Sequence, residues 1–248
     1  MNSELFPAHE AEVDALHAHQ VVLLAVATLA ELRESDTESH ILRVQHYVRA
    51  LALKLRSHPA HAPILTPSYI ETLCSCVPLY DLGSVGVPDR ILLKPGRLAP
   101  HEVAIMRTHT TQGFDAIVRA EKTLGKTSPM LAMVKELTLS HHERWDGSGY
   151  PQCLAGNSIP LSARIMALAD VFDALISNKV YKDGISHDKA LQIIISERST
   201  HFDPDLVDVL VEIHPEFQAI AQRFVDTDDD MQKKMEYMAN AIAEITEL

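Results

Sequence analysis

The sequence of 248 residues predicts an all-helical protein, and three features support this fold class. Aromatic residues make up only 5% of the chain, whereas Ala and Leu, which favour helices, are frequent. Nine Gly are few for an all-β chain of this length. Apolar residues recur every three or four positions along most of the chain, which is typical of a buried helical face. Since 46% of the residues are hydrophobic, the helices are expected to enclose a substantial core.

Helices are expected along almost the whole chain. The first, over residues 8–33 of an N-terminal segment of residues 1–33, either packs on the main domain or leads from an upstream signalling domain. The last, over residues 226–248, carries a Met and Ile stripe that serves either intramolecular packing or a homodimer seam. The helices expected between them, in a main domain of residues 34–225, span residues 37–57, 67–82, 100–121, 130–143, 161–177, 187–199 and 205–213.

The ends of these helices and the loops between them follow from local residue types. Thr66 is expected to cap the helix that starts at Pro67, and Gly83 is expected to end it. Residues 89–98 and 125–129 contain Pro and Gly and are expected to be loops. Residues 145–160 hold three Gly, and so long a structured connection tends to be functional.

Charge and cysteine content exclude several classes of protein. A net charge of -12 argues against general binding of nucleic acid polymers. Cys74, Cys76 and Cys153 lack Cys-x-x-Cys spacing, so neither a disulfide framework nor a thiolate zinc site is expected, and a reducing cytoplasm fits. The longest largely apolar run, residues 21–30, is too short to span a membrane, and no signal-peptide pattern is present.

The 14 His of the chain direct attention to metal ligands. His141 and His142 are adjacent at the end of an expected helix, where both side chains can turn toward one cavity. Asp170 lies on a helix that is apolar nearly all round, so its carboxylate is expected to be buried with a cation or several hydrogen-bond donors. Asp173 lies closer to the edge of that apolar face and could instead be an acid on the helix surface.

Four further residues have two interpretations each. His40 faces inward, and Asp36 lies one turn earlier, so the pair either binds one metal ion or merely stabilises the helix start. Asp81 lies near a helix end and His109 lies beside apolar residues. Each of these two is either a metal ligand or a hydrogen-bonded residue of the core.

Several ordered motifs together resemble one known family. They lie at residues 80–89, 94–96, 141–151, 159–161, 169–175 and 201–204. These segments are similar to the motifs of the HD-GYP phosphodiesterases, which hydrolyse the bacterial messenger cyclic di-GMP, and the resemblance covers roughly residues 30–225. It is closest to the output domains that follow receiver domains in two-component response regulators, although these residues contain no receiver domain.

The resemblance implies an HD-domain helical bundle with additional helices and a centre of two metal ions, or three. Its implied ligands are His40, Asp81, His109, His141, His142 and Asp170, with Asp81 bridging and Asp36 helping to hold an additional ion. Iron or manganese is the metal that the resemblance implies, and the mixed nitrogen and oxygen ligands also suit it. The implied reaction is hydrolysis of cyclic di-GMP to pGpG, then to GMP if the second bond is cut.

The chain departs from the family pattern at four places. Tyr80 replaces the His of the His-Asp doublet, Ser84 replaces a Lys near the substrate phosphate, and Asp36 replaces a Glu. Residues 179–181 are Lys-Val-Tyr where the family has Arg-Pro-Tyr. Tyr80 matters most, because a phenol ligates well only as phenolate. A ferric ion could deprotonate it, and otherwise a water fills the gap.

The roles implied for other residues follow from the same motifs. The positions assigned to catalysis are Asp81, Tyr80 and Ser84, and those assigned to substrate binding are Lys179, Lys182, Tyr150 and Asp173. Lys179 and Lys182 have a simpler interpretation as surface lysines, and Tyr150 either shapes the pocket or contacts partner proteins.

Competing hypotheses for the function remain at this point. The main one is a degenerate module that binds cyclic di-GMP, or a diguanylate cyclase (GGDEF) partner, without efficient turnover. A phosphohydrolase for another nucleotide and a purely structural helical protein fit the motifs less well.

Overall fold

The structure is a computed structural model that describes residues 38–94, 96–178 and 184–232, with residues 21, 25, 26, 28, 30, 33, 235–237 and 239. Asp36, Lys179 and Lys182 lie outside these residues, as do most of the two terminal helices expected from the sequence. Among the described residues there is no β-strand, only two isolated β-bridges. The all-helical prediction is therefore confirmed. No helix in this part of the chain is long and apolar enough to cross a membrane.

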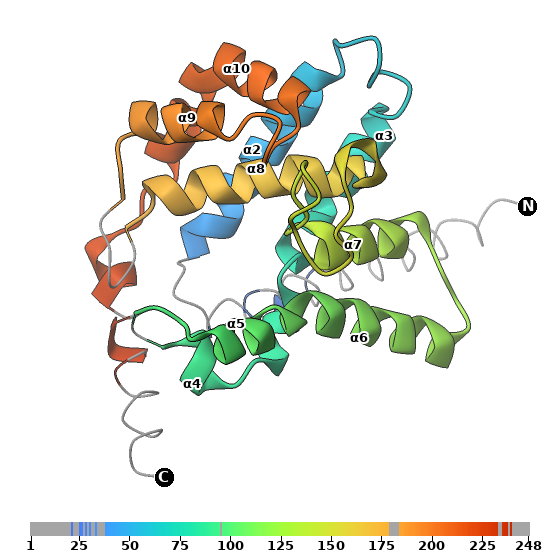
Figure 1. Ribbon diagram of the computed structural model, residues 1–248, viewed down its shortest axis with the longest axis vertical. Helices are drawn as coiled ribbons and strands as arrows, with labels where there is room; N and C mark the ends of the chain where they lie inside the picture. Colours follow the sequence, from blue (N-terminus) through green and yellow to red (C-terminus); the bar gives the residue numbers. More distant parts are fainter. Residues whose placement is uncertain are drawn as a thin grey trace, which may run out of the picture.

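The helices follow one another with short connections (Figure 1). The α-helices are α2 (Glu38–Leu55), α3 (Pro67–Cys76), α4 (Asp89–Leu92), α5 (Pro100–Met106), α6 (Thr108–Leu124), α7 (Pro129–Ser140), α8 (Leu161–Ile176), α9 (His187–Ser196) and α10 (Pro204–Arg223). The 3₁₀ helices are η1 (Val77–Leu79), η2 (Leu82–Gly86) and η3 (Gly156–Ser158).

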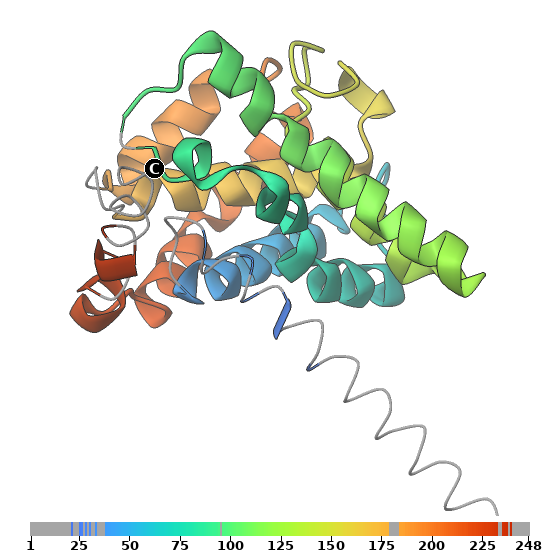
Figure 2. The same ribbon diagram turned by 90° about the horizontal axis from the view of Figure 1, so that it is seen from below.

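Helices α2 and α8 form the centre of the bundle. Helix α8 crosses the middle of the molecule with α2 beside it, and α10 and α3 pack on α2 (Figure 1 and Figure 2). Tyr47, Phe172 and Phe217 join these helices as fully buried rings. The rings of Tyr47 and Phe217 stack at 4.3 Å, and Phe172 meets Phe217 edge-on at 5.0 Å. This aromatic core fixes α2, which carries His40, against α8, which carries Asp170.

The helices around α2 and α8 form one layer of the bundle, and a second layer contains α6, α7 and η2. Helix α6 packs on α7 and on η2, so the segment that follows α3 is held against the start of α6. Gly83 in η2 makes this approach possible, because a Cβ atom there would overlap the backbone carbonyl of His109. Asp81, two residues before Gly83, is thereby brought close to His109.

Several expected boundaries were wrong, three of them for local physical reasons. The expected helix over residues 67–82 ends at Cys76, because Pro78 cannot donate to an α-helical hydrogen bond and η1 follows. The expected helix over residues 100–121 is divided at Arg107, where the hydroxyls of Thr108 and Thr110 donate to the carbonyls of Ile105 and Arg107. Residues 89–92, expected in a loop, form α4.

Two other local predictions have clear outcomes. Thr66 caps α3 as predicted, since its hydroxyl accepts a hydrogen bond from the amide of Tyr69 at 3.2 Å. The last described long helix, expected to end near residue 213, continues through Pro215 to Arg223 as α10. This extension allows Phe217 to reach the aromatic core.

Candidate metal centre

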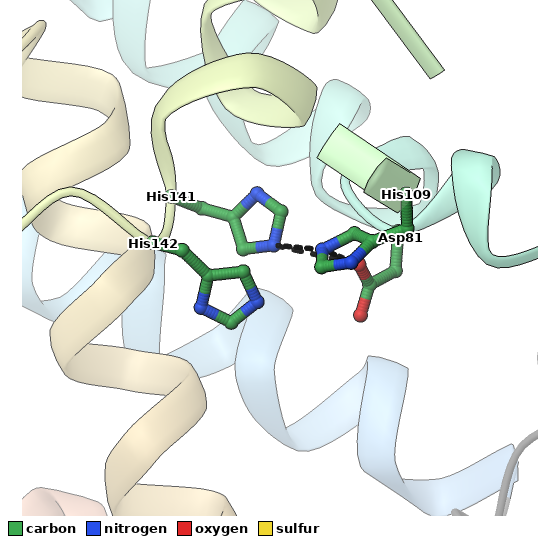
Figure 3. A group of neighbouring side chains, drawn as sticks. All are labelled: Asp81, His109, His141 and His142. Atoms are coloured by element: carbon green, nitrogen blue, oxygen red, sulfur yellow. Dashed lines mark hydrogen bonds and ion pairs between the residues drawn. The ribbon is translucent and has the colours of Figure 1, made fainter. Parts of the chain in front are cut away.

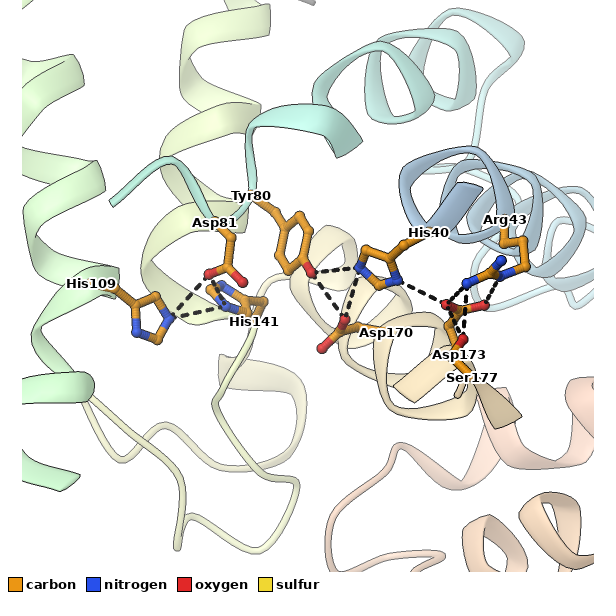
Figure 4. A network of polar contacts seen from close by, with 9 residues as sticks. All are labelled: His40, Arg43, Tyr80, Asp81, His109, His141, Asp170, Asp173 and Ser177. Carbon is orange, nitrogen blue, oxygen red and sulfur yellow. Dashed lines mark hydrogen bonds and ion pairs between the residues drawn. The ribbon is translucent and has the colours of Figure 1, made fainter. Parts of the chain in front are cut away.

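Polar side chains from five segments meet between the two layers of helices (Figure 4). His40 comes from the first turns of α2, and Asp170 comes from α8. Tyr80 and Asp81 lie between η1 and η2, His109 lies at the start of α6, and His141 and His142 follow α7. These residues are far apart in the sequence, and the two layers bring them to one region.

Four of these side chains form a compact cluster, which we call the Asp81 cluster: Asp81, His109, His141 and His142 (Figure 3). One ligand atom from each lies within 4.8 Å of those of the others. Oδ1 of Asp81 is 3.3 Å from Nε2 of His109 and 3.4 Å from Nε2 of His141. The two Nε2 atoms are themselves 3.4 Å apart. Such an arrangement can hold a single ion among all four groups.

The backbone orients two of the imidazoles toward the cluster. Nδ1 of His109 donates to the carbonyl of Met106 at 2.7 Å, and Nδ1 of His141 donates to the carbonyl of Leu137 at 2.7 Å. Because a carbonyl only accepts, each Nδ1 carries a hydrogen, and each ring in its neutral form presents the Nε2 lone pair to the cluster. This second bond is the usual device that fixes a metal-ligating histidine.

The charges of the cluster also fit a metal ion. Oδ1 of Asp81 is buried and has no hydrogen bond among the described residues. Burial opposes ionisation of Asp81, but His141, His109 and His142 outweigh it and hold the pKa of its carboxyl below the usual value. Burial and the neighbouring His141 and His109 hold the pKa of His142 well below its usual value. Burial alone would lower the pKa of His141, but its hydrogen bond and charge interaction with Asp81 hold that pKa above its usual value. The cluster therefore attracts positive charge, and a metal ion that binds the imidazole nitrogens supplies it in place of protons.

The other half of the centre has a different arrangement, in which Tyr80 lies between His40 and Asp170 (Figure 4). The Tyr80 hydroxyl donates to Oδ1 of Asp170 at 3.0 Å and lies 3.1 Å from Nε2 of His40. Nε2 of His40 is 3.8 Å from Oδ1 of Asp170. The phenol therefore connects the two residues that the sequence resemblance assigns to metal binding.

Asp173 differs from both expectations drawn from the sequence. Its side chain is 0% exposed, so it is neither a surface acid nor open to a substrate. Nε of Arg43 donates to its Oδ1 at 2.7 Å, and Nδ1 of His40 lies 2.8 Å from its Oδ2. Although burial opposes ionisation, hydrogen bonds and charges from His40 and Arg43 lower its pKa to about 2. Asp173 thus positions His40. The sequence analysis did not predict that Arg43, one turn after His40, would be buried.

The loop after His142 places an aromatic ring against the centre. The Tyr150 ring stacks on the His142 ring at 4.8 Å, and the Arg107 guanidinium lies 4.7 Å from the centre of the Tyr150 ring. The carboxylate of Glu143 holds the loop by accepting the amide hydrogens of Gln152 and Leu154 at 2.7 and 3.0 Å. The sequence motifs include Tyr150 but not Arg107, which lies outside all of them.

Ser84 lies near the centre in the chain but contributes no charge to it. Its side chain is buried, and its hydroxyl has no hydrogen bond among the residues described. The backbone carbonyl of Ser84 accepts a hydrogen bond from Arg33 at 3.4 Å. The amide of Ser84 donates to the backbone carbonyl of Asp81 at 2.9 Å, so Ser84 contacts Asp81 through the backbone and not through its hydroxyl.

A second group of potential ligands lies away from the centre. Nε2 of His61 is 2.9 Å from Oδ2 of Asp205, and His58 completes a set within 4.8 Å. His58 is exposed at the turn after α2. A metal ion bound to this second group would add to the number of ions measured per chain.

Comparison with known proteins agrees with the motifs and the fold. The family model described as HD domain matches residues 29–206. A cyclic di-GMP phosphodiesterase of Vibrio cholerae is 50% identical over 206 residues, which are 83% of this chain and 42% of that protein. One of Thermotoga maritima is 36% identical over 207 residues, 84% of this chain and 52% of that protein.

The chain thus spans about half the length of these curated relatives. Among solved structures, the HDG"Y"P protein Bd1817 of Bdellovibrio bacteriovorus matches with a TM-score of 0.50 and 17% identity, over 72% of this chain and 54% of that one. At this identity the match supports the fold alone. With the family model covering most of the chain and the HD-GYP motifs in order, the chain belongs to the HD domain family, in its HD-GYP branch.

Proposed function

We propose that this chain hydrolyses cyclic di-GMP to pGpG, and onward to GMP when the second bond is cut. The observation that carries this proposal is the convergence of three imidazoles and a carboxylate in the Asp81 cluster. The relatives at 50% and 47% identity, named as cyclic di-GMP phosphodiesterases or probable ones, support this substrate over other nucleotides.

Iron or manganese is the proposed metal, because three nitrogen ligands and one oxygen ligand suit these ions. Asp81, His109, His141 and His142 would hold it. When bound, such an ion would supply Lewis-acid chemistry, polarising the phosphodiester and lowering the pKa of water near neutral pH. Hydrolysis then joins the water oxygen to phosphorus, breaks the bond to the 3′ oxygen, and leaves the proton on that oxygen.

The chain must also attract a substrate with two phosphates despite a net charge of -12. We propose that Arg107 meets one phosphate in place of the lysine that the family has at Ser84. Arg107 is exposed beside the centre, and no ion pair of its guanidinium is found among the described residues. Lys179 and Lys182, outside those residues, are proposed as further phosphate contacts.

The biological setting is proposed from the sequence resemblance. The domain of residues 34–225 would act in the cytoplasm as an output domain in two-component signalling, under control of a receiver domain elsewhere. The helix that the sequence predicts over residues 226–248 would support a homodimer, and Tyr150 with its loop would meet GGDEF partners.

The test is to load the chain with iron or manganese, incubate it with cyclic di-GMP, and separate the products by chromatography. Formation of pGpG or GMP supports the proposal, with His141→Ala as the inactive control. A parallel incubation with 3′3′-cGAMP covers the activity named for a relative at 36% identity. The decisive case uses the chain at the same concentration as cyclic di-GMP. If the chain then binds cyclic di-GMP but forms no product, it is a binding module and the enzymatic proposal is wrong.

A further inference from the structure

We infer that Tyr80 divides the metal centre, so that the chain holds one metal ion in the Asp81 cluster while His40, Tyr80 and Asp170 remain hydrogen-bonded to one another. The inference rests on the proposed metal centre, but it concerns the number of ions and not the substrate. It differs from the count of two or three ions that the sequence resemblance implies.

The two halves of the centre differ in what their ligand atoms already contact. In the Asp81 cluster, Nε2 of His109 and of His141 point at a carboxylate oxygen that has no hydrogen bond among the described residues. In the other half, the Tyr80 hydroxyl lies 3.1 Å from Nε2 of His40 and 3.0 Å from Oδ1 of Asp170. In the cluster a first metal ion therefore finds nitrogen and oxygen lone pairs directed at one point. Beside Tyr80 the corresponding lone pairs are already engaged by the Tyr80 hydroxyl.

A second ion between His40 and Asp170 would have to displace the phenol from a closely packed position. Tyr80 is 6% exposed and His40 is 4% exposed. The Tyr80 ring also meets the His141 ring edge-on at 5.2 Å, so it packs against a ligand of the first ion. Leaving a buried hydroxyl without its partners weakens the binding of that ion by about 10- to 100-fold.

His40 is held in its present role from its other side. Nδ1 of His40 lies 2.8 Å from Oδ2 of Asp173, whose other oxygen accepts from Arg43. An imidazole at position 80 would offer a nitrogen lone pair to a metal ion. The protonated phenol of Tyr80 offers only a hydroxyl oxygen, which is a weak metal ligand. The substitution of this one side chain thus converts His40 from a ligand to part of a buried hydrogen-bonded network.

The experiment counts metal ions without substrate. The whole chain is stripped with a chelator, loaded with Mn²⁺, freed of excess metal and analysed by elemental analysis and electron paramagnetic resonance. His58→Gln is carried in parallel to remove a ligand of the second group. We expect one ion per chain with the spectrum of isolated Mn²⁺. Two ions per chain in the His58→Gln protein, with the spectrum of a coupled pair, would overturn the inference.

Three variants sharpen this count. Tyr80→His, which supplies a nitrogen ligand, is expected to bind two coupled ions, whereas Tyr80→Phe, which frees His40 and Asp170 but supplies no ligand, is expected to keep one. His40→Ala is expected to retain the ion, and His109→Ala is expected to lose it. Loss of the ion from His40→Ala, or a single ion in a folded Tyr80→His, contradicts the inference.

A spectroscopic measurement on the unmodified chain covers the case in which the variants do not fold. With Fe³⁺ we expect no visible phenolate-to-iron absorption, and such a band would overturn the inference because it places Tyr80 on the metal. Two coupled ions with turnover of cyclic di-GMP would overturn the inference alone. One ion without turnover would leave the inference standing and overturn the proposed function.

Discussion

Nε of Arg43 and Oδ1 of Asp173 form an ion pair at 2.7 Å in which the Asp173 side chain is fully buried and the Arg43 side chain is 4% exposed. The same guanidinium also contacts Asp226 at 3.0 Å. Breaking a buried pair by removing one partner leaves an uncompensated charge, which costs far more than the loss of an exposed pair. The pair therefore ties the position of His40 to the stability of the bundle.

Replacing Arg43 with Met is expected to lower the free energy of unfolding by about 3 kcal/mol, because it leaves the Asp173 carboxylate buried without a cation. Urea unfolding followed by circular dichroism measures this. The matched control is Arg49→Met, which breaks the exposed pair of Arg49 with Glu71 and is expected to change stability little. Equal effects of the two substitutions would contradict the structural role given to Arg43.

Acid is expected to remove a defined part of the stability through Asp173. Its pKa is about 2 in the folded protein and would be near its ordinary value of 3.8 in the unfolded chain. A depressed pKa stabilises the fold above the unfolded value, and that contribution disappears as pH falls through 4 toward 2. It amounts to about 2 kcal/mol. Asp173→Asn should abolish this part of the loss between pH 5 and pH 3, and an unchanged pH dependence would refute the assignment.

The Tyr150 ring is expected to support metal binding through His142. Tyr150→Ala removes the ring that stacks on His142 at 4.8 Å, and it should weaken Mn²⁺ binding by about tenfold, as is usual for groups that orient a metal ligand. Tyr150→Phe keeps the ring and should bind the metal as the unmodified chain does. Calorimetric titration measures both, and equal affinities for the two variants would argue against the stacking role.

Arg107 is expected to affect substrate binding and not metal content. Arg107→Ala should raise KM for cyclic di-GMP by about tenfold through loss of a charged contact to phosphate, and Arg107→Lys should recover part of this. The control is Arg119→Ala, which removes an exposed cation from α6, the helix that follows Arg107. A KM that responds equally to both Ala substitutions would indicate only a general charge effect.

Features encoded within one segment could be predicted from the sequence. The helical periodicity and the Thr66 cap depend on neighbours in the chain, and both were predicted. Thr108 and Thr110, whose hydroxyls compete with the helical hydrogen bonds at Arg107, give too weak a pattern to predict the break between α5 and α6.

The site was predictable as a set of residues but not as an arrangement. The motifs singled out His109, His141 and Asp81, which the structure brings together. The burial of Asp173 depends on Arg43, which is 130 residues away, and no local pattern indicates that pair. Nor could the sequence show that the Tyr80 hydroxyl would lie between residues of α2 and α8, because three separate elements determine that contact.

The central claim, that Asp81, His109, His141 and His142 hold a metal ion, is tested most directly by anomalous diffraction at the iron absorption edge from crystals of the iron-loaded chain. We predict an anomalous peak enclosed by Oδ1 of Asp81 and the three imidazoles, with none between His40 and Asp170. A map without a peak at the Asp81 cluster, from protein shown to contain iron, would contradict the account.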